Sequence, residues 1–201
     1  MFLQRIKNIT VIILCTSFIT SCNQSISYKR PQILTNFGSF ECSTHKLAGK
    51  QYSSIWEKTR SGFCLDTVYS PRVNKEIEWF MNNKEFLYRS LDRARPFLYH
   101  VILELERNNL PFELALLPIV ESGYQPYAYS PSKAAGIWQF IPPTAREYGL
   151  KRNWWYDGRR DIFASTKAAS HFLKDMKRHF KGDWLLAIAS YNTGAGNVGK
   201  S

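Results

Sequence analysis

The apolar side chains of this chain recur every three or four residues, and this spacing constrains the fold more than any other feature. The periodicity begins at Arg72, and Pro96 is expected to interrupt it before it resumes. A further amphipathic helix is predicted from Asp161 to Phe180, and a last one from Trp184 to Asn192. The first stripe comprises Ile77, Phe80, Met81, Leu87 and Leu91, and the stripe after the proline comprises Phe97, Leu98, Val101, Ile102 and Leu105. No segment alternates as a strand does, so the chain is expected to be all-α.

The first 21 residues are interpreted as a lipoprotein signal peptide. Arg5 and Lys7 precede an apolar run that is too short to span a membrane. The stretch Ile19-Thr20-Ser21-Cys22 resembles a bacterial lipobox, which implies cleavage before Cys22 and lipidation of its thiol. Asn23 after that cysteine implies sorting to the outer membrane, on its periplasmic face in a Gram-negative envelope. An ordinary signal peptide with a chance cysteine is the alternative.

Residues 22–71 are expected to form a tether and a loosely ordered lead-in, with a short helix around Ser54 to Lys58. Cys42 and Cys64 are the remaining candidates for a disulfide in an oxidising compartment, and a free pair of thiols is the alternative. The four histidines lie too far apart in the sequence for metal-ligand spacing, so no metal site and no cofactor are predicted.

One carboxylate, Glu121, stands at the end of an apolar segment from Phe112 to Val120. This segment is expected to be one buried helix that starts at Pro111 and ends near Gly123. The negative end of the helix dipole and burial against neighbouring apolar side chains are both expected to raise the pKa of Glu121. A carboxylic acid that stays protonated near neutral pH can donate a proton to a glycosidic oxygen. An exposed acid at a helix end is the alternative.

The loop that follows Glu121 is suited to a neutral, polar ligand. No Asp or Glu occurs between Ser122 and Arg146. Aromatic faces and side chains that donate and accept hydrogen bonds are the groups that bind sugars. The loop supplies such groups at Tyr124, Tyr127, Tyr129, Ser130, Trp138 and Gln139. Trp138 and Phe140 are alternatively core residues, whereas Gln139 between apolar neighbours is expected to have a buried polar role.

Three motifs in order resemble those of the soluble-lytic-transglycosylase catalytic domain: Glu121-Ser122, Gly136-Ile137-Trp138-Gln139-Phe140 and Tyr191-Asn192-Thr193-Gly194. The similarity runs almost continuously from Ile77 to Asn197. This family, glycoside hydrolase family 23, has a goose-type lysozyme-like fold. The resemblance implies a catalytic domain over residues 72–201. Because relatives continue with further helices and often with LysM repeats, the domain is expected to be incomplete at its C-terminus.

The resemblance also implies a reaction and the residues that carry it. Glu121 would act as the single acid and base that cleaves the bond between N-acetylmuramic acid and N-acetylglucosamine, leaving a 1,6-anhydromuramoyl end. Substrate-binding roles fall on Ser122, Gln139, Tyr191 and Asn192, and the aromatic loop adds Trp138 and Tyr129. Asp157 and Asp161 are interpreted as structural, capping the next helix. A lysozyme-type hydrolase would need a second carboxylate near Glu121.

The formal net charge of +11 favours an acidic partner. Peptidoglycan stem peptides and anionic phospholipids fit an exported chain, and the lipid would anchor it to the membrane. Nucleic acid is the competing partner for a basic chain, but the secretory signal argues against it, and no recognised nucleic-acid motif is present, so no nucleic-acid partner is predicted. A solvated basic face and a catalytically impaired, wall-binding lipoprotein remain the alternatives.

Overall fold

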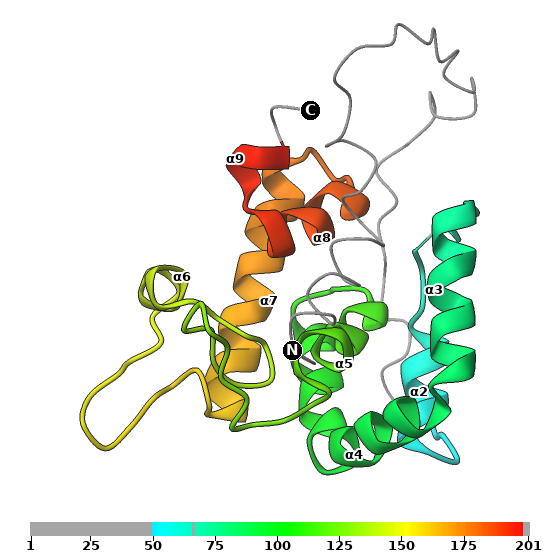
Figure 1. Ribbon diagram of the computed structural model, residues 1–201, viewed down its shortest axis with the longest axis horizontal. Helices are drawn as coiled ribbons and strands as arrows, with labels where there is room; N and C mark the ends of the chain where they lie inside the picture. Colours follow the sequence, from blue (N-terminus) through cyan, green and yellow to red (C-terminus); the bar gives the residue numbers. More distant parts are fainter. Residues whose placement is uncertain (1–49, 66, 199–201) are drawn as a thin grey trace, which may run out of the picture.

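Helices form all of the regular secondary structure in residues 50–65 and 67–198, the part of the chain that the computed structural model describes. In these residues, β-type pairing is limited to isolated bridges. The elements are α2 (Ile55–Ser61), α3 (Pro71–Asn82), α4 (Lys84–Arg107), η3 (Phe112–Leu116), α5 (Leu117–Ser122), α6 (Pro142–Glu147), α7 (Ile162–His179), α8 (Trp184–Thr193) and α9 (Ala195–Val198). The expected all-α class is confirmed (Figure 1).

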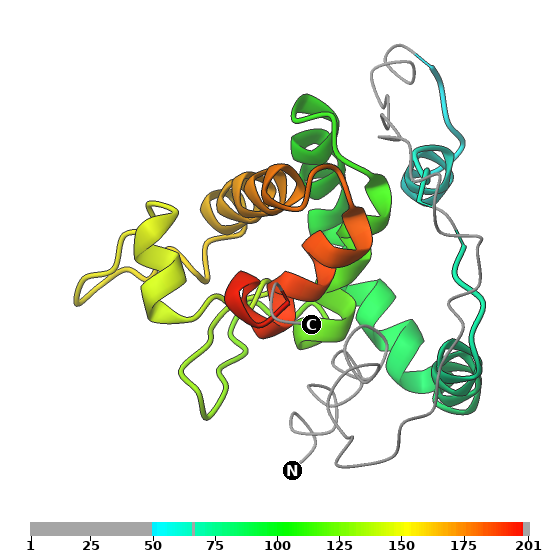
Figure 2. The same cartoon turned by 90° about the horizontal axis from the view of Figure 1, so that it is seen from above.

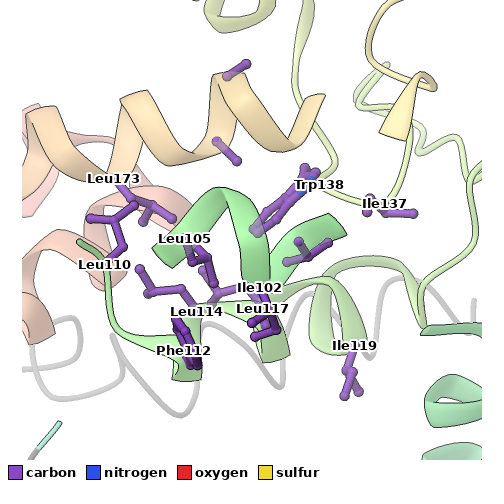
Figure 3. Packing of buried hydrophobic residues seen from close by; sticks show 14 of the residues in the cluster. Ile102, Leu105, Leu110, Phe112, Leu114, Leu117, Ile119, Ile137, Trp138 and Leu173 are labelled. Carbon is purple, nitrogen blue, oxygen red and sulfur yellow. The ribbon is translucent and has the colours of Figure 1, made fainter. Parts of the chain in front are cut away.

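The core forms where the second half of α4 meets η3, α5 and α7. Leu98, Val101, Ile102 and Leu105 of α4 are all fully buried, as the second apolar stripe predicted. Figure 3 shows Leu105 and Ile102 surrounded by side chains from η3, from α7 and from the loop that holds Trp138. Helix α8 packs on α7, so the C-terminal elements lie beside this core (Figure 2).

The prediction that Pro96 interrupts the helix is wrong, because α4 runs unbroken from Lys84 to Arg107. A proline inside a helix removes one backbone donor and crowds the preceding turn, at a cost of about 3 kcal/mol. Ala94 and Leu98 flank it, and both are fully buried against the core. Tertiary packing on both sides of the proline therefore outweighs the local penalty.

The first apolar stripe faces inward only in part: Leu91 packs against the core, and Phe80 and Leu87 are half-buried. Ile77 is 54% exposed and Met81 is 58% exposed. Helix α3 instead contacts α4 through an aromatic cluster, in which the Trp79 and Phe80 rings lie 5.7 and 6.4 Å from the ring of Phe86. Phe80 of the expected stripe thus takes part in this contact beside Trp79, whereas Ile77 and Met81 are exposed.

Residues 55–65, expected within a loose lead-in, pack against η3 instead. Glu113 accepts hydrogen bonds from the backbone N–H groups of Cys64 and Leu65 at 2.6 and 2.8 Å. Lys58 adds an ion pair with Glu106 of α4 at 2.8 Å. The sulfur of Cys64 is in a disulfide, and the other three cysteines all precede residue 50. Its partner therefore lies outside the described residues, and pairing with Cys42 stays a prediction.

None of the helices within residues 50–65 and 67–198 is long and apolar enough to cross a membrane. The interpreted signal peptide, the lipobox and Cys22 lie outside the described residues. In the described part of the chain, no group of three or more His, Cys, Asp or Glu side chains could hold a metal ion.

Candidate active site

The segment expected to be one helix before Glu121 is divided into two. Residues Phe112–Leu116 form the 3-10 helix η3, and Leu117–Ser122 form the short α-helix α5. Pro118 lies in the first turn of α5, where its missing N–H is tolerated, and this position explains the new start. The predicted end is confirmed, since Gly123 adopts the left-handed conformation with φ of +59°.

The turn after α5 fixes the place of Glu121. The N–H groups of Gly123 and Tyr124 donate to the carbonyls of Ile119 and Pro118, each at 3.0 Å. The ring of Tyr124 is buried below, its hydroxyl donates to the carbonyl of Ala115 at 2.6 Å, and burial raises its pKa. Tyr124 is therefore a core residue and not the sugar-binding group that the loop composition suggested.

Glu121 lines a cavity of about 360 Å³ between α5, the 132–144 segment and the end of α8, which we call the Glu121 cavity. Its carboxylate oxygen Oε1 is shielded from solvent. The predicted residues Gln139, Tyr191 and Asn192 line the same cavity, although they are 18 to 71 positions further along the chain. The complete lining is Val120, Glu121, Ser132, Ala134, Gln139, Phe140, Ile141, Thr144, Phe172, Ser190, Tyr191, Asn192, Thr193 and Gly194.

Ser122 does not line this cavity. Its side chain is buried, and its hydroxyl donates to the carbonyl of Ile137 at 2.9 Å. This bond joins the end of α5 to the loop of residues 136–140, which contributes the next wall. Ser122 is therefore not placed for the direct substrate contact that was predicted. It links α5 to the 136–140 loop instead.

The wall formed by residues 136–140 depends on two left-handed positions. Gly136 has φ of +79°, and a Cβ at this residue would lie 1.7 Å from the carbonyl oxygen of Arg159. Gln139 has φ of +50°, and its Nε2 donates to the carbonyls of Gly136 and Ala128 at 2.9 and 3.3 Å. The expected buried polar role of Gln139 is present, because its amide holds the loop from within while the residue borders the cavity.

Trp138 is fully buried and does not line the cavity. Its indole Nε1 donates to the hydroxyl of Thr166 in α7 at 3.0 Å, and Figure 3 shows its ring inside the core near Ile102. A ring with no exposed face cannot stack on a sugar, so the core alternative holds for Trp138. Phe140 is also buried, as expected.

The opposite wall is the C-terminal turn of α8. The hydroxyl of Tyr191 donates to the carbonyl of Trp138 at 2.6 Å, and its ring packs edge-on against Phe172. Burial, and to a lesser extent the charge of Glu121, raises the pKa of Tyr191 well above its usual value, so the phenol stays protonated. The amide nitrogen Nδ2 of Asn192 is buried and has no hydrogen-bond partner within the described residues.

Tyr129 lies apart from these residues. It lines a second, larger cavity with Trp154 and Trp155, and the guanidinium of Arg160 stands 5.9 Å from the centre of its ring. Asp157 and Asp161 also line this second cavity and not the Glu121 cavity. Asp161 caps α7 by accepting from the N–H of Ala164 at 2.9 Å, which confirms its structural interpretation.

Arg159 is a residue that the sequence reasoning missed. Its side chain is only 2% exposed, pairs with Asp157 at 2.6 Å, and donates to the carbonyls of Lys133 and Phe140 at 2.6 and 3.3 Å. The pair lowers the pKa of Asp157. A short Asp-x-Arg spacing was the only local signal, and it does not reveal that the guanidinium reaches into the loop beside Gln139.

Comparison with known proteins agrees with this geometry. Residues 102–201 match the family described as "Transglycosylase SLT domain". The chain is 45% identical over 130 residues to membrane-bound lytic murein transglycosylase D of Escherichia coli (strain K12), which covers 65% of this chain and 29% of that protein. It is 28% identical over 127 residues to membrane-bound lytic murein transglycosylase F of Shewanella pealeana, which covers 59% of this chain and 25% of that protein.

The chain thus spans less than a third of the length of either relative. The matched family region contains Glu121, the 136–140 loop and the Tyr191-Asn192 wall, the three features that form the Glu121 cavity. The lysozyme-like, all-α character that the resemblance implied agrees with the helices described above. Through residues 102–201, this chain belongs to the transglycosylase SLT domain family.

Proposed function

We propose that this chain is a peptidoglycan lytic transglycosylase in which Glu121 is the single acid and base. One observation carries the proposal: among the residues that line the cavity in the described part of the chain, Glu121 is the sole carboxylate. A glycosidase that divides the work between two carboxylates places them on either side of the bond. The nearby candidates Asp157 and Asp161 line the other cavity. Family membership and the activities named for the relatives support the same reaction.

In the first step Glu121 donates its proton to the glycosidic oxygen between N-acetylmuramic acid and N-acetylglucosamine. The bond from that oxygen to the anomeric carbon breaks, and the 2-acetamido oxygen of the substrate stabilises the positive charge that develops. This step needs the protonated carboxylic acid, and the Glu121 oxygen Oε1 is shielded from solvent. The N-acetylglucosamine side leaves with the transferred proton.

In the second step the ionised Glu121 takes the proton of the muramoyl C6 hydroxyl. The hydroxyl oxygen then bonds to the anomeric carbon, and a 1,6-anhydro ring forms without consumption of water. The proton from the C6 hydroxyl restores the carboxylic acid of Glu121, so one carboxyl group serves both steps.

The neighbouring side chains are proposed to hold the sugars rather than to exchange protons. Asn192 presents a buried Nδ2 donor that a substrate oxygen would satisfy, and an unpaired buried amide costs about 1–3 kcal/mol. Gln139 offers its amide oxygen, since Nε2 is already bonded to the loop. Tyr191 keeps its proton and its bond to the Trp138 carbonyl, so it positions the loop. Ser122 is likewise a positioning residue, through its bond to Ile137.

The test is the mass spectrum of the muropeptides that the purified chain releases from sacculi. Anhydro-ended products should appear with the wild-type protein and disappear with Glu121→Gln. The matched control is Glu147→Gln, which changes an exposed acid at the end of α6 and should leave the products unchanged. Reducing-end products would mean hydrolysis. Cleavage at the wild-type rate by Glu121→Gln would refute the assignment of the acid.

We also propose that the chain works in the cell envelope, anchored by a lipid on Cys22 at the inner face of the outer membrane. The relatives named as membrane-bound murein transglycosylases support the envelope, and the lipobox-like stretch supports the anchor. Incorporation of labelled palmitate into the wild type and not into Cys22→Ser is the expected result. Equal labelling of both proteins would rule out Cys22 as the attachment site.

A further inference from the structure

The second cavity, of about 860 Å³, is larger than the one at Glu121 and has no role in the reaction above. Its walls are the loop of residues 152–161, which extends from the body of the molecule between α6 and α7 (Figure 1), the start of α7, part of α4, and Tyr127 with Tyr129. We call it the tryptophan cavity after Trp154 and Trp155.

The rim of the tryptophan cavity exposes several aromatic rings to solvent. Trp154 is 88% exposed and Trp155 is 90% exposed, and their rings are nearly perpendicular at 6.4 Å. Tyr127, Tyr129 and Phe163 add three more exposed rings. Large aromatic side chains left in water forgo a substantial burial energy. A cluster of them around one concavity is the arrangement that binds the faces of pyranose rings.

Within the part of the chain that the structure describes, three arginines line this cavity, and two of them, Arg152 and Arg159, pair with Asp157 at 3.8 and 2.6 Å. Arg159 is closed in its pair with Asp157, and Asp161 is bonded to the N–H of Ala164 and to the Tyr156 hydroxyl. Arg160 has no carboxylate partner among the residues that the structure describes, and its guanidinium stands over the ring of Tyr129. A planar guanidinium held beside aromatic faces favours a carboxylate ligand that arrives with a ring to stack.

We propose that the tryptophan cavity is a second saccharide-binding site that takes a pyranose unit carrying an acidic peptide. The rings of Trp154 and Trp155 stack on the sugar, and Arg160 pairs with a carboxylate of the peptide. This inference rests on the proposed function, because peptidoglycan is the polymer that presents both groups on one strand. The site binds peptidoglycan at a place other than the glycosidic bond that is cleaved.

The two cavities share one piece of backbone. Tyr127 and Tyr129 line the tryptophan cavity, whereas Ser132, Ala134 and Gln139 of the same segment line the Glu121 cavity. Arg159 lines the tryptophan cavity and reaches through to the Phe140 carbonyl. A strand bound at Trp154 therefore lies against the same segment that forms a wall of the catalytic groove.

A lipid surface is the competing partner for exposed tryptophans beside cations. One feature of the site favours the saccharide. The rings surround a concavity, which a discrete ligand can enter and a flat bilayer cannot.

The tryptophan indole N–H groups allow a test that reports on this cavity alone. The Glu121→Gln protein, labelled with ¹⁵N at tryptophan, is titrated with a purified disaccharide-tetrapeptide and, separately, with neutral N-acetylglucosamine tetramer. The Trp154 and Trp155 signals should shift and saturate with the acidic ligand. Arg160→Ala should weaken that binding by roughly 3- to 10-fold and leave the neutral tetramer unaffected. Arg89→Ala, an exposed arginine near the start of α4, is the control and should change neither titration.

Three results would overturn the inference. The first is no shift of the Trp154 and Trp155 signals with either ligand. The second is an affinity for the acidic ligand that is the same in the wild type and in Arg160→Ala, and the third is shifts that occur only with anionic phospholipid vesicles. The proposed function would survive each of them. Failure of the proposed function would give a different result, namely no anhydro-ended products from sacculi treated with the wild-type protein.

Discussion

Gly136 is the position where a single methyl group should do the most damage to the candidate site. The residue opens the 136–140 loop, has φ of +79°, and receives the Gln139 amide on its carbonyl. A Cβ there would lie 1.7 Å from the carbonyl oxygen of Arg159 and 2.7 Å from its carbonyl carbon. Both are backbone atoms, so no rotamer change can relieve the overlap.

The cost of Gly136→Ala has two parts. The left-handed conformation costs a non-glycine residue about 1–2 kcal/mol. Separating the overlapping atoms requires a backbone shift in a packed region, which typically costs about 1–3 kcal/mol more. The substitution should therefore lower the free energy of unfolding by about 2–5 kcal/mol, a large part of the roughly 5–15 kcal/mol of a typical domain.

Gly149→Ala separates these two parts. Gly149 has φ of +75°, nearly the same as Gly136, but no atom lies within 4 Å of its added Cβ. It should lose only the conformational part, about 1–2 kcal/mol. Urea unfolding followed by circular dichroism measures both variants. Equal losses for Gly136→Ala and Gly149→Ala would show that the close approach to Arg159 is absent and would refute the reasoning.

Three other substitutions test the walls of the site. Tyr191→Phe removes the 2.6 Å bond to the buried Trp138 carbonyl and should cost about 1–3 kcal/mol in urea unfolding; no loss would contradict that bond. Ser122→Ala should lower kcat on sacculi and leave KM nearly unchanged, because it loosens a wall without touching the sugar; a rise in KM alone would contradict the positioning role. Asp157→Asn leaves the buried Arg159 charge without its carboxylate and should cost about 3–5 kcal/mol at neutral pH. Because the pair lowers the pKa of Asp157 below its ordinary 3.8, that stabilisation is present above about pH 4 and is lost as the pH falls through the lowered value. Thermal melts should then show a smaller acid-induced loss in Asp157→Asn than in wild type, and an equal loss would contradict the pKa shift.

Local signals predicted what depends on local chemistry. Asp161 and Asp183 cap α7 and α8 through hydrogen bonds to residues three positions on, and that spacing is readable from the sequence. The buried stripe of α4 also follows directly from its period. The long-range meeting of Glu121 with Tyr191 and Asn192 came from the family resemblance, because no local rule joins residues so far apart.

The errors share a physical cause. Whether Ser122 or Trp138 meets a ligand depends on which partner lies within 3 Å in the folded chain, and a backbone carbonyl and the Thr166 hydroxyl reach them first. Pro96 was misjudged because burial of its neighbours exceeds a local penalty. Ile77 was misjudged because a partner helix selects the face that packs. Each outcome is decided by tertiary contacts that hydropathy cannot supply.

Two consecutive carbonyls of the 136–140 loop face two different helices. The Ile137 oxygen accepts from Ser122 of α5, and the Trp138 oxygen accepts from Tyr191 of α8. The peptide unit between these two carbonyls connects α5 to α8, and its length is set by covalent geometry. The distance between Glu121 at the end of α5 and the facing wall of α8 therefore depends on backbone atoms. If the proposed function holds, side chains along the Glu121 cavity could be exchanged to change which glycans it admits, and the distance from Glu121 to the facing wall should be preserved as long as the Ser122 and Tyr191 hydroxyls remain.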